Sequence, residues 1–187
     1  MNDLFERMTI ALPRVQAWIE DLIAEHTPRA SAAADAGFPR LREYFGDEVL
    51  RELKVVSVKR IPVVPLTGFG LPEFAAVEHM AVSGITYRGM CFLHESMMSE
   101  STCFHELVHA LQWKTLGWNF LIVYGIGLVE FGYARSPLEA AAFDYQRMFE
   151  RGERVPDLSG LVASSALDAD RRAGEYLRLH GVVPRGV

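Results

Sequence analysis

The sequence predicts an α+β fold, in which a small mixed or antiparallel sheet packs on one helix and several further helices surround them. Apolar residues recur at helical spacing through most of the chain. Before residue 94, two short stretches, 53–64 and 85–93, are rich in β-branched or aromatic residues. With 187 residues, half of them hydrophobic, the chain can bury one substantial core, so we expect a single domain over 1–187.

The first 45 residues predict helices. Between positions 4 and 23, apolar side chains return every three or four residues with charged residues between them, as on one face of a helix. We predict a helix over about 2–26, which Pro13 could interrupt. An Ala- and Ser-rich connector follows over 28–37, and 39–45 could form a short second helix.

The two stretches rich in β-branched residues predict strands. In the first, valines and isoleucines run from 55 to 64 and are cut by Pro62 and Pro65. The second, 85–93, reads ITYRGMCFL, and we expect one strand there with a bend at Gly89.

Beyond residue 94 the pattern turns helical. Ser99 or Ser101 can cap a helix that Gly117 ends, and further helices are predicted over much of 118–131, from 136 to about 151, and from Ala166 onward. The uncharged run 116–129 is about 14 residues long, whereas a membrane-spanning helix needs roughly 20. We therefore expect a buried helix, with a shallow membrane contact as the alternative.

Charge and cysteine content narrow the function classes. The formal net charge is -5, and the 19 Lys and Arg are dispersed, so we expect no nucleic-acid partner. Cys91 and Cys103 are too few for a disulfide framework, and the charged residues near the N-terminus leave no signal-peptide core. These features favour a cytoplasmic protein and leave its oligomeric state open.

One motif carries chemistry: HELVH over 105–109. On a helix, His105 and His109 are four residues apart, so both imidazoles leave the same face and can share a tetrahedral zinc ion. Glu106 lies beside them, where it can act as general base on a water molecule without being a ligand. The other face carries apolar residues that would anchor the helix in the core.

Catalytic zinc usually takes three protein ligands, so a third donor is required. No histidine follows at the metzincin position, and the downstream carboxylates Glu130, Glu139 and Asp144 are the candidates. We choose Glu139, because it lies in the first turn of a predicted helix that a preceding turn could bring against the HELVH helix. Two alternatives stay open: Glu130 as the ligand, and Glu139 as half of a capping box with Ser136.

Other polar residues could support such a site. Asp144, one turn beyond Glu139, could accept a hydrogen bond from a ligand histidine. Tyr133 is our candidate for a catalytic hydroxyl that donates to a developing oxyanion, with Tyr145 and His180 as alternatives.

Over residues 84–150, HELVH followed by SPLEAAAFD resembles the gluzincin class of zinc metallopeptidases. Within that class, HELVHALQW resembles the small minimal-zincin proteins of bacteria, including SprT-like ones. The resemblance implies a zincin-like domain with its metal-site core over about 53–151 and its N-terminal helix placed where it could cover the cleft. It also implies that 85–93 is an edge strand, which binds an extended substrate through its backbone.

The function expected from motif and resemblance is zinc-dependent hydrolysis of peptide bonds in a peptide or protein substrate. Zn²⁺ would bind His105, His109 and Glu139, with Glu106 and Tyr133 as catalytic residues. Two alternatives remain. The protein could bind zinc in a regulatory or binding role with little catalysis, or it could hydrolyse non-peptide amides.

Overall fold

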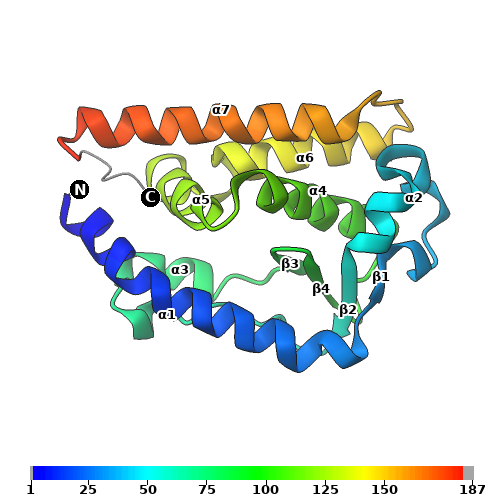
Figure 1. The fold of residues 1–187 in the computed structure, drawn as a ribbon, viewed down its shortest axis with the longest axis horizontal. Coiled ribbons are helices and arrows are strands. Elements are labelled where there is room, and N and C mark those ends of the chain that lie inside the picture. The colour runs from blue at the N-terminus through cyan, green and yellow to red at the C-terminus, as the bar shows by residue number, and fades with distance from the viewer. Residues whose placement is uncertain (1, 183–187) are drawn as a thin grey trace.

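Residues 2–182 are described by the computed structural model in Figure 1, and they form an α+β fold, as predicted. Within this part of the chain there are seven α-helices and one four-stranded sheet. The helices are α1 Asn2–His26, α2 Arg42–Glu52, α3 Ala75–Glu78, α4 Glu100–Leu116, α5 Asn119–Phe131, α6 Pro137–Glu150 and α7 Leu158–Leu179. The strands are β1 Ser31–Ala32, β2 Lys54–Val58, β3 Gly84–Tyr87 and β4 Met90–His94.

The sheet is mixed, with strand order β1-β2-β4-β3. β2 and β4 run parallel, and the other two pairs are antiparallel. The prediction of one bent strand over 85–93 is wrong, because the chain reverses at Arg88 and Gly89 and forms a β3–β4 hairpin. Arg88 adopts φ 55°, a conformation suited to a tight turn but uncommon for a residue with a side chain. Of the segment 85–93, only the β3 part therefore lies at an edge of the sheet, and β4 lies inside it.

Helices cover both faces of the sheet. Side chains alternate along a strand, so Val55 and Leu93 join the cluster around α4, whereas Val56 and Phe92 join Val15 and other α1 residues on the opposite face. Figure 1 shows the strands between α1, below them, and α4, above them. α6 and α7 lie on the far side of α4 (Figure 1). α4 is therefore the central helix, and its side chains from Cys103 to Trp113 are all buried.

The ends of α4 match the sequence signals. The Ser99 hydroxyl accepts a hydrogen bond from the backbone N–H of Thr102 at 3.0 Å, and Gly117 follows the last turn with φ 55°. α1 spans the predicted range and continues through Pro13. α7 begins at Leu158, eight residues before the predicted Ala166, because Asp157 adopts φ 51° and its carboxylate accepts from Gly160 N–H.

Within residues 2–182, none of the helices combines the length and the apolar character that crossing a membrane requires. The uncharged run 116–129 becomes the end of α4 and most of α5, and α5 has 13 residues. Phe120, Val123 and Ile126 are buried in the core of the protein. The buried helix expected there is confirmed.

Candidate metal and catalytic site

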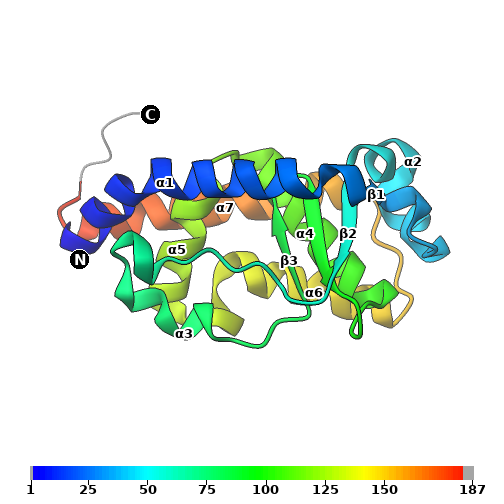
Figure 2. The ribbon, with the colours of Figure 1, turned by 90° about the horizontal axis from the view of Figure 1, so that it is seen from below.

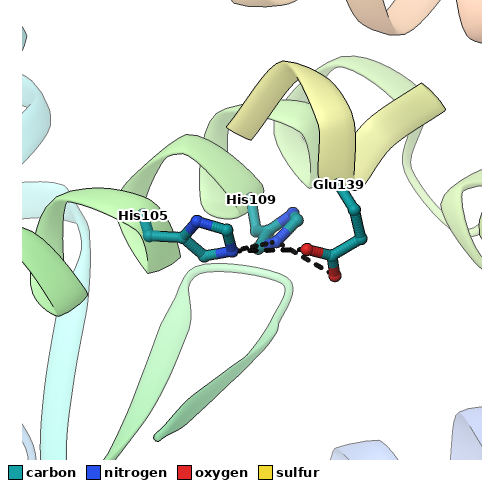
Figure 3. A group of neighbouring side chains, drawn as sticks. All are labelled: His105, His109 and Glu139. Atoms are coloured by element: carbon teal, nitrogen blue, oxygen red, sulfur yellow. Dashed lines mark hydrogen bonds and ion pairs between the residues drawn. The ribbon is translucent and has the colours of Figure 1, made fainter. Parts of the chain in front are cut away.

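Two helices bring His105, His109 and Glu139 together (Figure 3). The Nε2 atoms of the two histidines, both on α4, are 3.0 Å apart. Glu139 comes from the first turn of α6, where Pro137 begins the helix. Its two carboxylate oxygens lie 3.4 Å from His105 Nε2 and 3.4 Å from His109 Nε2. All three side chains are buried, so their polar atoms need partners.

The spacing of these atoms suits a small divalent cation. Zinc bound tetrahedrally at about 2.0–2.1 Å from its ligands places those ligands about 3.3–3.4 Å from one another, close to the separations seen here. Oε2 of Glu139 is buried and has no hydrogen-bond donor among the described residues. A cation would satisfy this oxygen and the two facing imidazole nitrogens together. The three residues could therefore hold a metal.

Two glutamines orient the histidine rings. Gln112 Oε1 lies 2.8 Å from His109 Nδ1, and Gln146 Oε1 lies 3.0 Å from His105 Nδ1. An amide oxygen only accepts, so each Nδ1 carries the proton and each Nε2 is left free for a metal. Gln112 also donates to the carbonyl of Leu138 at 2.9 Å, which ties α4 to the turn that carries Glu139.

Sequence reasoning missed both glutamines, although Gln112 lies three residues after His109 on the same helix face. It proposed Asp144 for this role, and that proposal is wrong. Asp144 is exposed and pairs with Arg147. α6 instead turns Gln146 toward His105.

Glu106 is buried beside the histidines and is held by the edge strand. The Thr86 hydroxyl lies 2.7 Å from Glu106 Oε2 and 3.0 Å from the Glu106 backbone carbonyl. Gly84 leaves room for the carboxylate, because a Cβ built at Gly84 would lie 2.7 Å from Glu106 Oε1. Burial raises the pKa of Glu106, and the two histidines only partly oppose this shift. A carboxyl of this kind is suited to accept and return a proton.

The charges of the cluster shift the pKa values of the other groups in opposite directions. Burial disfavours the charged form of His109, but Glu139 outweighs it and raises the pKa of His109 to about 9. Burial likewise opposes ionisation of Glu139, but His109 and His105 outweigh it and hold the pKa of that carboxyl well below its usual range. Without a metal, the cluster therefore holds a proton on His109 against a charged Glu139.

Two tyrosines adjoin Glu139. Tyr133, the predicted hydroxyl donor, follows α5 in a short 3-10 turn, and burial together with the charge of Glu139 raises its pKa. Tyr124 on α5 donates to Glu139 Oε1 at 2.5 Å, and sequence reasoning missed it. A polar residue within the uncharged 116–129 run was the available signal.

The alternatives weighed from the sequence lie elsewhere. Glu130 is exposed near the end of α5, and it is not part of the cluster. His180 is exposed at the end of α7, and Tyr145 packs in the core on the other side of α6. The capping box does not form, since α6 has no side-chain cap and the Ser136 hydroxyl has no hydrogen-bond partner among the described residues.

An apolar cavity of about 150 Å³ adjoins the site. Its walls come from α1, segment 63–82, β3, α4 and α5. Glu106, His109, Tyr124, Tyr133 and Glu139 supply polar groups to the wall. The candidate site thus opens into a space lined mainly by aliphatic and aromatic side chains.

No protein-family model, curated protein or solved structure matches this chain. Its chemistry has to be inferred from the residues and geometry of the site.

Proposed function

We propose that this protein is a zinc-dependent metallopeptidase with a zincin-like fold of the gluzincin type. One observation carries the proposal: three buried ligand atoms converge from His105, His109 and Glu139, with the carboxylate of Glu106 in the same cavity wall. This combination matches catalytic zinc sites, which use three protein ligands and a neighbouring general base. The buried free thiols of Cys91 and Cys103 are compatible with a cytoplasmic location.

Zinc bound by the three ligands would polarise the substrate carbonyl and lower the pKa of a water molecule. Glu106 would take the proton from that water and pass it to the leaving amine. Its raised pKa favours the first of these steps, because a carboxylate of higher pKa is a stronger base and keeps the proton once it has taken it. Tyr133 would donate its hydroxyl hydrogen to the carbonyl oxygen of the substrate. Tyr124, bonded to Glu139, would position that ligand.

The free edge of β3 would align a peptide substrate. Ser83 O accepts from His94 N–H, and pairing alternates along an antiparallel ladder, so the backbone groups of Gly84 and Thr86 point away from β4. The Trp113 indole N–H already donates a hydrogen bond to the Thr86 carbonyl at 3.0 Å. An extended peptide would therefore form backbone hydrogen bonds with the N–H and carbonyl of Gly84 and with the N–H of Thr86, beside Glu106.

The burial of the site favours a second candidate, the hydrolysis of small non-peptide amides. Glu139 is 2% exposed and His105 7% exposed, so a compact substrate fits more readily than a folded protein. A zinc-binding protein with a regulatory role and little catalysis is the remaining alternative. This alternative predicts that replacing Glu106 does not change the rate of any reaction measured.

Replacement of the general base tests the proposal. Glu106→Gln keeps the shape of the side chain but cannot take a proton, so it should lower kcat/KM for peptide cleavage about 10²- to 10⁴-fold while zinc content stays stoichiometric. Glu95→Gln, at an exposed position outside the site, is the matched control. Full activity in Glu106→Gln would reject the peptidase proposal.

A further inference from the structure

We propose that the substrate places a compact apolar group, of leucine to phenylalanine size, in the cavity beside Glu106. This inference rests on the proposed function and names the substrate class of that site. The cavity wall is built almost entirely of aliphatic and aromatic side chains, among them Leu12, Val64, Phe74, Val82, Phe120 and Leu128. The charged or titratable groups in this wall are Glu106, His109 and Glu139 of the site itself and the tyrosines Tyr87, Tyr124 and Tyr133.

The size of the cavity sets the size of the group. An apolar cavity of about 150 Å³ lined by Leu, Ile and Phe can hold a molecule such as benzene. An alanine side chain would leave most of this space empty, and a leucine or phenylalanine side chain would fill it. A basic or acidic side chain buried among these aliphatic and aromatic groups would carry a large desolvation cost.

Two close approaches keep the cavity compact. Met8 of α1 packs against α5, where a Cβ built at Gly125 would lie 2.5 Å from Met8 Cε. On the other side, Arg7 donates to the Gly70 carbonyl at 3.0 Å and pairs with Glu73, which ties α1 to the segment between β2 and β3. The segment runs on the same side as α1 (Figure 2). The cavity therefore suits a single side chain or acyl group rather than a long chain.

The cavity also lies where the reacting bond must be. Glu106 and His109 line it, and so do Gly84 and Thr86, whose backbone would align the substrate. An apolar group held there would be attached close to the scissile carbonyl. A filled apolar pocket raises kcat/KM by roughly 10- to 200-fold per methylene group that it binds.

Val82 offers the variants for the test, because it is half-buried in the cavity wall and lies outside helix and strand. Val82→Phe reduces the cavity, and Val82→Ala enlarges it. Val129→Phe makes the same change on an exposed position of α5 and serves as the control. A metal-free crystal under xenon pressure gives a readout independent of catalysis, since xenon enters dry apolar cavities.

The experiment combines that crystal with kinetics of the zinc-loaded protein. Substrates are blocked dipeptide amides with Gly, Leu or Phe on either side of the scissile bond. N-acyl amides whose acyl group has as many carbon atoms as these side chains show whether the cavity binds an acyl group or a side chain. We expect a preference of at least tenfold for Leu or Phe over Gly. Val82→Phe should reduce it to below about threefold, Val82→Ala should shift it toward Phe, and Val129→Phe should retain it. Xenon should occupy the cavity of the natural protein and not that of Val82→Phe.

The outcomes separate this inference from the proposed function. Cleavage without side-chain preference overturns the inference and leaves the peptidase proposal standing. Xenon in the cavity, with binding of a Leu dipeptide that Val82→Phe weakens, supports the inference even if nothing is cleaved, and the peptidase proposal then fails. A cavity without xenon in a protein that shows no preference overturns the inference.

Discussion

His109 determines how the site responds to protons. Its pKa of about 9 places a proton on this residue at neutral pH when no metal is bound. A metal ligand must present a free lone pair, so zinc bound as proposed would compete with the proton for the same nitrogen. Because Nδ1 donates its hydrogen to Gln112 Oε1, the nitrogen for which the proton and zinc would compete is Nε2.

Zinc affinity should therefore rise with pH. Below the pKa of about 9 each bound zinc displaces the proton of His109, so the apparent affinity should increase roughly tenfold per pH unit between about pH 6 and pH 8. Calorimetric titrations in buffers of different ionisation enthalpy measure the released proton. An affinity that does not change across this range would show that His109 is neutral in the metal-free protein.

Gly84 leaves room for Glu106, the proposed general base. A methyl group at this position would meet the Glu106 carboxylate at 2.7 Å, so Gly84→Ala must displace either the carboxylate or β3. We expect kcat to fall about 10- to 100-fold with zinc affinity little changed, because the atoms nearest to the added methyl group belong to Glu106 and not to a proposed ligand. Gly89→Ala in the same hairpin, where the nearest atom is an ordinary 3.7 Å away on Leu53, is the control. Equal activity of both variants would contradict this role.

Among the elements, α4 has the strongest local signals, and its ends are predictable from sequence for that reason. The Ser99 cap and the Gly117 stop are both present. The β3–β4 hairpin was missed because both strands are rich in β-branched and aromatic residues, and Arg88-Gly89 lacks the usual Asn-Gly turn signal. The start of α7 was missed because glycine and serine residues weaken helical patterning after Leu158.

The cap of α4 should contribute measurably to stability. Ser99→Ala removes the acceptor of the Thr102 N–H and should lower the free energy of unfolding by about 1 kcal/mol. Urea denaturation of the metal-free protein measures this difference. Ser164→Ala, on an exposed position inside α7, should have a much smaller effect. If the two substitutions cost the same, the cap is not what stabilises the start of α4.

At the scale of the whole molecule, the site depends on contacts between elements far apart in sequence. The HELVH motif predicts two ligand candidates and a base from local spacing alone. Glu139 was selected by its place at a helix start, and the structure brings it to the histidines. The glutamines and Tyr124 were not predictable, because only the packing of α4 against α5 and α6 gives them their contacts.

The apolar cavity is also a property of the assembled fold. Its walls combine residues from Met8 to Glu139, and the sequence pattern identifies these residues only as hydrophobic. The parallel pairing of β2 with β4 likewise comes from tertiary packing rather than strand propensity. This pairing places β4 inside the sheet and leaves β3 at an edge, beside Glu106.

The central claim is that His105, His109 and Glu139 bind one zinc ion. The most direct measurement is an anomalous-scattering map, recorded on both sides of the zinc absorption edge, from a crystal grown with zinc. We predict a single strong peak within about 2.0–2.2 Å of both Nε2 atoms and a Glu139 oxygen. Zinc bonded to Glu130, or no peak between the two histidines, would contradict the claim.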